Sequence, residues 1–348
     1  MRGESRNALT PPSPLSPLIR AIQKIRVIRG KMACAALGAA VLSVLPARAQ
    51  WPFSTPSAAA TPFAGFSDTT APDFSGAPQL ADIPLVPIPF DQLSNQSVDD
   101  LGQFALSIKP ADWKHAETDH FIIHYRRVTE AERVVREVEY DLAFVAKSLG
   151  ATPEQYAKKS HVFIFEDQTE WQGFLSKTQV PPWAASFAHG DELFLNLRST
   201  TPGAPPFDSH TLAHETTHAV VARLYPGSHW PLWLNEGLAE YMGGASVAAM
   251  KNQPIRRHEH TLNFAGMSLD QLQQIQVYPQ DPVQVAELYE TSEKLVRFIM
   301  TELPRERFTQ FIDSVLSGHT LEQALLQVYG DKLASYDDFE KKYARFNK

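Results

Sequence analysis

The hydrophobic and polar residues after residue 113 form two different patterns. In its first half, short apolar runs such as HFIIHY, HVFIFE and ELFLNL are typical of buried strands. Between these runs, apolar residues recur every three or four positions, which is typical of amphipathic helices. The predicted strands cover residues 120–125, 161–166 and 192–197, and the predicted helices between them cover residues 131–149 and 168–176.

The second half of this region predicts helices almost throughout. A sheet that is followed by helices is typical of α+β domains. We therefore predict an α+β fold in which a small mixed sheet packs on helices and precedes a mostly helical C-terminal half. The predicted helices of that half cover residues 209–225, 231–242, 283–303, 305–317, 320–329 and 335–346.

The first 49 residues have the features of a bacterial signal peptide. They contain eight Lys or Arg and one acidic residue, followed by an apolar run from Ala33 to Leu45 and then by Ala47-Arg48-Ala49. The apolar run has 13 residues, whereas a membrane-spanning helix needs about 20. We predict cleavage after Ala49, with either Met1 or Met32 as the start. The mature protein is then exported, either periplasmic or secreted, and has no membrane span.

Residues 50 to 110 predict a linker or a pro-segment. They contain nine prolines and no Lys or Arg before Lys109. Proline removes backbone donors and blocks helix and sheet ladders, so we expect this segment to be largely disordered. It leaves room for a short helix over residues 97 to 107. The folded domain is expected over residues 111 to 348.

The charge and the cysteine content exclude several classes of partner and bond. Without the first 49 residues, 24 Lys and Arg stand against 38 Asp and Glu, a formal charge of −14. This charge provides no basic footprint for nucleic acid or for an anionic membrane surface. The single cysteine, Cys34, lies in the predicted leader, so the mature chain has no disulfide, which suits an oxidising compartment. The sequence gives no indication of the oligomeric state.

The stretch HETTH, residues 214–218, has the spacing of a metal site. At 3.6 residues per turn, His214 and His218 lie on one face of the predicted helix with their β-carbons about 6 Å apart, so both imidazoles can reach one ion. Glu215 lies beside the first histidine, near the ion without having to bind it. This is the arrangement in which the glutamate acts as a base.

A third ligand is predicted in WPLWLNEGLAEY, residues 230–241. Pro231 can open a helix there and Gly243-Gly244 can close it. Glu236 follows His218 after 17 residues, and two helices joined by a short loop can bring its carboxylate to the same ion. Two histidines and one glutamate leave the fourth position of a tetrahedral zinc open for water. We therefore predict a Zn²⁺ site made of His214, His218 and Glu236.

HETTH with the downstream NEGLAE resembles the gluzincin zinc metallopeptidases, the clan of the thermolysin and aminopeptidase type. The segment PLWLNEGLAEY is most similar to the peptidase-MA-like domains of exported bacterial proteins. The resemblance implies that His214, His218 and Glu236 are the zinc ligands. It also implies that Glu215 is the general base and acid.

The resemblance extends to two residues around the metal. It implies that Glu240, one turn beyond Glu236, hydrogen-bonds the free nitrogen of a ligand histidine, that of His214, which orients the ring. It also implies that Tyr289, in AELYETSEKLVRFI on a later helix, binds the oxyanion of the reaction. An ordinary half-buried helix tyrosine is the alternative for Tyr289.

Other features narrow the class of peptidase. ELFLNL resembles the edge strand along which gluzincins bind an extended peptide. The glycine-rich signature of aminopeptidases is not visible, and Val221 and Leu224 occupy the positions at which metzincins need glycine and histidine. His229, in the loop between the two motif helices, is an alternative ligand, although loop histidines of this kind are more often surface or packing residues. The same solvated or core role is expected for His120, His124, His161, His258 and His260.

The chemistry of these residues predicts an exported zinc metallopeptidase that hydrolyses the peptide bonds of a peptide or protein substrate. Zinc-activated water would attack the carbonyl, and Glu215 would take its proton. The first alternative is a non-catalytic zinc-containing binding or scaffold module with the same fold. A structural zinc, however, normally has four protein ligands rich in cysteine, which the mature chain lacks. A second alternative is a metal-free helical domain in which HETTH is a polar face.

Overall fold

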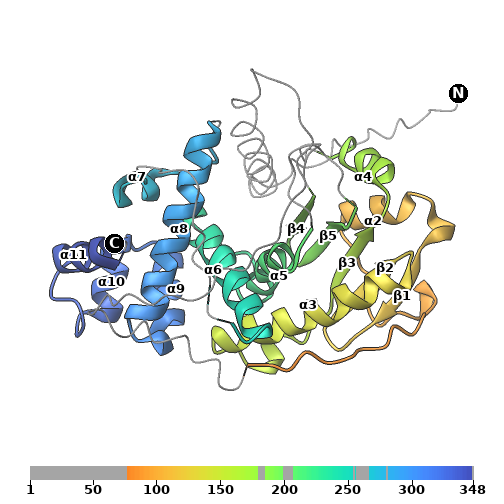
Figure 1. The fold of residues 1–348 in the computed structure, drawn as a ribbon, viewed down its shortest axis with the longest axis horizontal. Helices are drawn as coiled ribbons and strands as arrows, with labels where there is room; N and C mark the ends of the chain where they lie inside the picture. Colours follow the sequence, from red (N-terminus) through yellow and green to blue (C-terminus); the bar gives the residue numbers. More distant parts are fainter. Residues whose placement is uncertain are drawn as a thin grey trace, which may run out of the picture.

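The computed structural model describes residues 77–178, 185–198, 207–253, 255, 266–279 and 281–346 (Figure 1). The predicted leader and the first part of the predicted linker, residues 1–76, lie outside the described residues, as do His258 and His260. Among the described residues, no helix combines the length and the apolar character needed to cross a bilayer.

A five-stranded mixed sheet forms one side of the described part (Figure 1). Its strand order is β1-β2-β3-β5-β4, with β2, β3 and β5 parallel and with β1 and β4 antiparallel to their neighbours. The three predicted strands are present as β2, β3 and β5. The strands are β1 (Lys114–Glu117), β2 (Phe121–Tyr125), β3 (Ser160–Phe165), β4 (Ser186–His189) and β5 (Glu192–Asn196).

The edge strand next to the metal motif is β4, which corrects the expectation from ELFLNL. That sequence forms β5, which lies between β3 and β4 and therefore has both of its edges paired. β4 is only four residues long, and a run of this length shows too little alternation to be predicted. The turn at Gly190, with φ of 56°, connects β4 to β5.

Helices lie on both faces of the sheet, and helices are the only regular elements in the described part of the C-terminal half, which confirms the predicted α+β class (Figure 1). Short 3₁₀ turns lie at Phe90–Gln92 (η1), Pro110–Asp112 (η2), Pro153–Tyr156 (η3) and Arg305–Arg307 (η4). The helices are α2 (Asp100–Ser107), α3 (Val128–Ser148), α4 (Gln168–Leu175), α5 (Ser209–Leu224), α6 (Leu232–Met250), α7 (Leu269–Gln274), α8 (Pro282–Glu302), α9 (Phe308–Leu316), α10 (Leu321–Tyr329) and α11 (Tyr336–Phe346).

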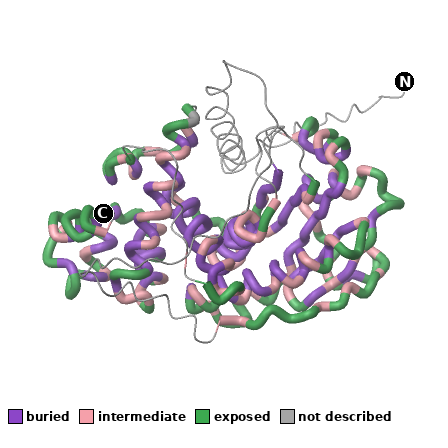
Figure 2. Tube along the Cα trace, in the orientation of Figure 1, coloured by how far each residue is buried: buried purple, intermediate pink, exposed green. Residues whose placement is uncertain are grey.

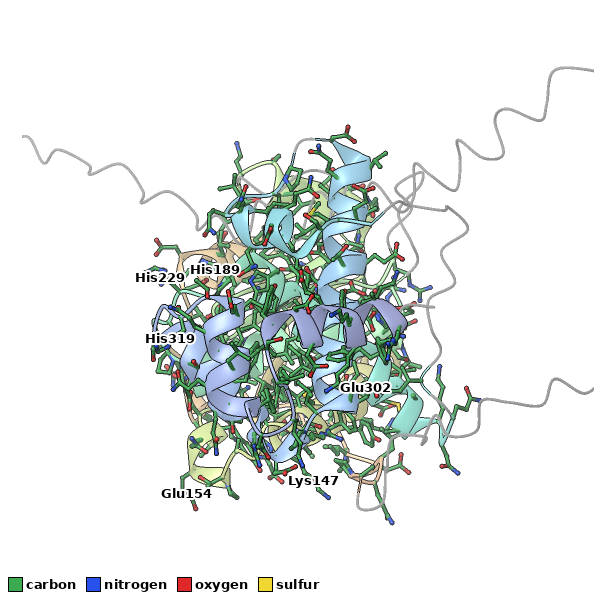
Figure 3. All side chains as sticks on the ribbon, turned by 90° about the vertical axis from the view of Figure 1, so that its left-hand side faces the viewer. Lys147, Glu154, His189, His229, Glu302 and His319 are labelled. Atoms are coloured by element: carbon green, nitrogen blue, oxygen red, sulfur yellow. The ribbon has the colours of Figure 1, made fainter. Side chains whose placement is uncertain are left out.

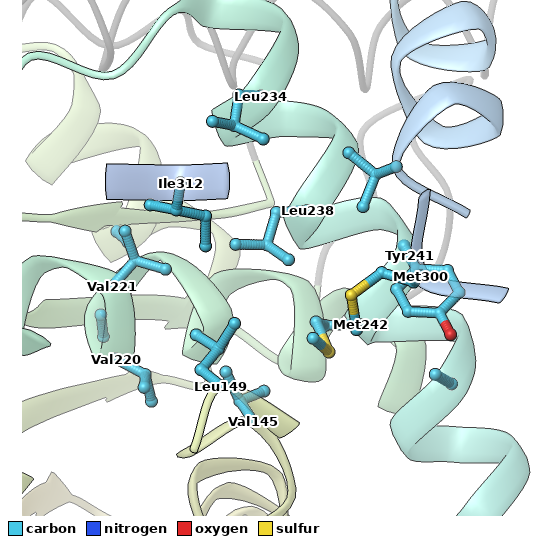
Figure 4. Close-up of a cluster of buried hydrophobic side chains, with 14 of the residues drawn as sticks. Val145, Leu149, Val220, Val221, Leu234, Leu238, Tyr241, Met242, Met300 and Ile312 are labelled. Atoms are coloured by element: carbon cyan, nitrogen blue, oxygen red, sulfur yellow. The ribbon is translucent and has the colours of Figure 1, made fainter. Parts of the chain in front are cut away.

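The sheet separates two hydrophobic cores because successive side chains of a strand point to opposite faces. In β3, Val162 and Ile164 belong to the larger core with α3, α5 and α6, whereas Phe163 and Phe165 belong to the smaller one with α2 and α4. Buried positions are densest in the strands and in the central helices (Figure 2). Figure 4 shows side chains of α5, α6, α8 and α9 meeting in the larger core.

The short helix expected within residues 97 to 107 is α2. The Asp99 side chain caps it by accepting a hydrogen bond from the backbone N–H of Gly102 at 2.7 Å. Its residues Leu101 and Ala105 are buried in the smaller core. This part of the expected linker therefore packs on the sheet, because a capped turn with two apolar residues can cover the aromatic side chains of β3.

Helix α6 runs beyond the predicted end at Gly243-Gly244 and reaches Met250. A Cβ atom at Gly243 would lie 3.1 Å from the backbone oxygen of His210, at the start of α5. The absence of a side chain at Gly243 therefore serves the close approach of α5 to α6. The prediction that these glycines close the helix was wrong, because a glycine inside a helix can serve packing as well as termination.

Candidate metal centre

Helix α5 holds the two histidines of HETTH on one buried face. Its first turn is capped by Asp208, whose side chain accepts a hydrogen bond from the backbone N–H of Thr211 at 2.8 Å. His214 and His218 are 5% and 4% exposed, and their ring centroids are 4.8 Å apart. The i, i+4 spacing thus brings both rings to the same side, as predicted.

Helix α6 brings a carboxylate to these rings. The Nε2 atoms of His214 and His218 are 3.1 Å apart. Oε2 of Glu236 lies 3.6 Å from the first and 3.8 Å from the second. Glu236 is fully buried. Within the described residues, this is the one group of three or more His, Cys, Asp or Glu side chains whose ligand atoms come together, all within 4.8 Å of one another.

The separations within this group fit a divalent cation. Ligand atoms at zinc-like bond lengths in a tetrahedral site lie roughly 3.3–3.6 Å from one another. The three observed separations, between 3.1 and 3.8 Å, lie on either side of that range. Burying a carboxylate against two imidazoles without a compensating charge is costly, and a cation at their centre removes that cost.

Glu240 orients the ring of His214. Its Oε1 lies 3.3 Å from Nδ1 of His214, so that nitrogen carries the proton and Nε2 offers its lone pair. Burial by itself lowers the pKa of the His214 imidazole, but the Glu240, Glu215 and Glu236 carboxylates together outweigh burial and raise that pKa above its usual value. Oε2 of Glu240 also lies 3.7 Å from Nε2 of His210.

Asn235 contacts the other two members of this group, His218 and Glu236, and the sequence interpretation did not identify it. Its side chain hydrogen-bonds His218 and donates to Oε1 of Glu236 at 3.3 Å. Burial, together with the nearby His214 ring, lowers the pKa of His218 to about 3, so this ring is neutral. The asparagine of NEGLAE was the available signal, because a residue next to Glu236 on the helix can reach the ring of His218.

Two tyrosines approach Glu236. The Tyr289 hydroxyl, on α8, donates a hydrogen bond to Oε2 of Glu236, the oxygen that faces both histidines. The Tyr278 hydroxyl lies 3.5 Å from the Tyr289 hydroxyl and also hydrogen-bonds Glu236. Burial and the Glu236 charge raise the pKa of both phenols well above the usual value, so both remain donors. Tyr278 lies outside the helices and strands, and no periodic pattern indicated it.

The close packing of α6 on α8 makes the contact with Tyr289 possible. A Cβ atom at Gly237 would overlap the backbone carbonyl of Ser292 on α8. Glycine at position 237 therefore lets the two helix backbones approach, which brings Tyr289, three residues before Ser292, to Glu236.

Glu215 is buried on α5 beside the histidines. Its Oε1 accepts a hydrogen bond from Oγ of Ser186 at 3.3 Å. Ser186 is the first residue of β4, so the predicted base is linked to the edge strand of the sheet. No sequence pattern connects these two residues, because 29 positions separate them.

A cleft of about 1040 Å³ opens beside the centre. The end of the cleft at the centre is lined by His218, Asn235 and Tyr278. Tyr289 is not among the described lining residues. His229 lines the cleft on an exposed loop and is not a member of the group formed by His214, His218 and Glu236.

His120, His124 and His161 are not members of this group. His120 pairs with Glu139 at 2.7 Å. His124 and His161 are buried on the sheet, where Nε2 of His124 lies 2.9 Å from Nδ1 of His161. His120 and Glu139 form a partly exposed pair, whereas His124 and His161 belong to the packing of the sheet.

An α+β fold with two histidines on one helix and a glutamate on the next defines a gluzincin-like metallopeptidase domain. A profile of the peptidase MA superfamily matches residues 140–345, more than half of the sequence. The chain therefore belongs to the peptidase MA superfamily. No curated protein gives a significant match to the sequence.

Proposed function

We propose that this protein is an exported zinc metallopeptidase that hydrolyses peptide bonds in peptide or protein substrates. The observation that carries the proposal is the convergence of Nε2 of His214, Nε2 of His218 and Oε2 of Glu236 at separations of 3.1 to 3.8 Å, with Glu215 buried next to His214 on α5. Export is proposed from the charged leader, the apolar run and the cleavage pattern at Ala49.

His214, His218 and Glu236 are proposed to hold the ion. Two imidazoles and one carboxylate suit zinc and leave room for water and substrate. When bound there, zinc lowers the pKa of a coordinated water and polarises the carbonyl of the substrate. Glu240 and Asn235 support the site by keeping the two imidazoles oriented.

Glu215 is proposed to take the proton of the attacking water and to deliver it to the leaving amine. Its carboxylate is held on one side by the Ser186 hydroxyl, which leaves its position fixed relative to β4. A fixed base needs little rearrangement in the transition state.

The two tyrosines are proposed to have different tasks. The sequence pointed to Tyr289 as the donor to the oxyanion, but its hydroxyl hydrogen-bonds the ligand Glu236. Tyr278 lines the cleft with His218 and Asn235, so its phenol is the better placed of the two to meet a substrate carbonyl. We assign oxyanion stabilisation to Tyr278 and positioning of Glu236 to Tyr289.

The proposal is tested by a Glu215→Gln variant of the exported protein. Zinc content by elemental analysis and cleavage of a diverse peptide library, with and without a chelator, are measured on the same samples. We expect about one zinc per chain in both proteins and a loss of turnover of at least about 10³-fold in the variant. Glu302→Gln, at the exposed end of α8, is the matched control (Figure 3). A zinc-loaded wild-type protein that cuts no peptide would instead support the scaffold alternative.

A further inference from the structure

The cleft beside the metal centre has walls whose chemistry the proposed hydrolysis does not explain. We propose that this cleft binds an internal, apolar stretch of a polypeptide, so that the protein is an endopeptidase that selects a bulky apolar or aromatic side chain on one side of the cut. This inference rests on the proposed function.

The apolar walls come from three segments that the fold brings together. Val221 and Tyr225 lie at the end of α5, Trp230 and Leu232 lie where α6 begins, and Val277 lies just before α8. The Tyr225 and Trp230 rings pack edge to face, with centroids 5.3 Å apart. The side chain of Val277 is 67% exposed. Covering such surface with an apolar side chain is favourable, by about 25 cal/mol per Å².

The lysine, the arginine and one histidine of the cleft already have hydrogen-bonded or ion-paired partners. Lys158 pairs with Asp191 at 2.9 Å. Arg223 donates to Oγ of Ser160 at 2.7 Å and to two backbone carbonyls, at 3.1 and 3.2 Å. His189, at the end of β4, hydrogen-bonds the Asp99 carboxylate. An exopeptidase needs a charged group for the terminal amine or carboxylate of its substrate. Apart from the exposed His229, the described lining has such groups only in existing pairs, which favours a chain that continues in both directions.

The size and position of the cleft fit several residues of an extended chain. Its volume of about 1040 Å³ lies just above the range of small-molecule sites, about 300–1,000 Å³. The lining is continuous from His218 at the metal centre to Ala188 and His189 on the edge strand β4. His189 and His229, both labelled in Figure 3, line this cleft.

The substrate test uses peptides whose two ends are blocked by acetyl and amide groups. A set of internally quenched peptides differs at one position near the cut, with Phe, Leu, Ser, Asp or Lys. We expect blocked and free peptides to be cut at similar rates, and kcat/KM for Phe or Leu to exceed that for Asp or Ser by about 10- to 100-fold. Cleavage that requires a free terminus would overturn the inference.

Two charge variants locate this selectivity in the cleft. Val277→Asp should favour the Lys peptide over the Asp peptide, and Val277→Lys should reverse that preference, each shifting the ratio of kcat/KM by about tenfold. Val86→Asp is the matched control, because Val86 is 63% exposed and does not belong to the cleft. Ratios that stay within about twofold of wild type in both Val277 variants would overturn the inference.

A binding measurement separates this inference from the proposed function. Calorimetric titration of the inactive Glu215→Gln protein with the same blocked peptides reports on the cleft without turnover. Selective binding of the Phe and Leu peptides, with no cleavage by the zinc-loaded wild type, would contradict the proposed hydrolysis alone. Cleavage by the wild type with no selectivity for apolar residues would contradict the cleft assignment alone.

Discussion

Oε1 of Glu240 lies 3.3 Å from Nδ1 of His214. Glu240 follows Glu236 by one turn of α6, so this helix supplies both a proposed ligand and the group that orients another ligand. The proton on Nδ1 is fixed by the carboxylate, and the lone pair on Nε2 is therefore directed toward Glu236 and His218.

This relationship predicts that Glu240→Ala weakens metal binding without unfolding the protein. Loss of the carboxylate frees the His214 ring to rotate and to change tautomer. We expect zinc affinity to fall by about 10- to 100-fold in competition with a chromogenic chelator. Glu302→Ala, which removes an exposed carboxylate at the end of α8, should leave the affinity unchanged. Equal zinc affinities in the Glu240→Ala and Glu302→Ala variants would show that Glu240 does not support metal binding.

The two tyrosines predict different kinetic defects. Tyr278→Phe removes the phenol that lines the cleft, so kcat should fall by about 10²-fold or more while KM and zinc affinity stay nearly constant. Tyr289→Phe removes the donor to Glu236, so zinc affinity should fall by about tenfold or more. Chelator competition and steady-state kinetics on both variants measure this. The opposite assignment would follow if Tyr289→Phe lowered kcat at full zinc occupancy and Tyr278→Phe did not.

The contact between α6 and α8 predicts that Gly237→Ala is destabilising. The added methyl group would meet the backbone carbonyl of Ser292, and one of the helices would have to move. We expect the free energy of unfolding in urea to fall by about 1–3 kcal/mol. Gly173→Ala is the control, since a Cβ atom there meets no atom within 4 Å on α4. This control should be neutral or stabilised by up to about 1 kcal/mol.

The buried histidines of the sheet predict a loss of stability in acid. Burial lowers the pKa of His161 to about 4, below the usual value of 6.5. Between pH 6.5 and 4 the unfolded chain therefore binds a proton that the folded chain does not, so this contribution is present above pH 6.5 and is lost as the pH falls toward 4. His161→Gln should reduce the slope of the unfolding free energy with pH in this window by up to about 1.4 kcal/mol per pH unit.

The control for this pH dependence is His229→Gln, because His229 is exposed in a loop. Urea unfolding of each protein at several pH values between 4 and 7.5 gives the slope. A slope that is the same in the wild type and in His161→Gln would show that His161 is not the group that titrates.

Local patterns explain what the sequence was able to predict. The spacing of His214 and His218 fixes their common face, and the apolar runs of β2, β3 and β5 are long enough to identify buried strands. The helix that contains NEGLAE is predicted from its own residue pattern and from Pro231, which can open a helix. These features depend on neighbours in the sequence, so one chain is sufficient to recognise them.

Tertiary packing explains what the sequence did not provide. Ser186 meets Glu215 because β4 pairs at the edge of the sheet next to α5, and Tyr278 meets Glu236 from a segment between α7 and α8. Gly243 looked like a helix terminator, but its role is the close approach to His210. None of these contacts leaves a periodic signal, because each joins residues that are distant along the chain or lie outside regular elements.

The central claim is that one zinc ion is held jointly by His214, His218 and Glu236. X-ray absorption at the zinc edge of the purified protein tests it most directly. We predict one zinc per chain with imidazole nitrogen and carboxylate oxygen at about 2.0–2.2 Å and no sulfur ligand, and a changed spectrum or lost zinc in Glu236→Ala. A protein that binds no zinc, or a Glu236→Ala variant whose zinc content and spectrum equal those of the wild type, would contradict the claim.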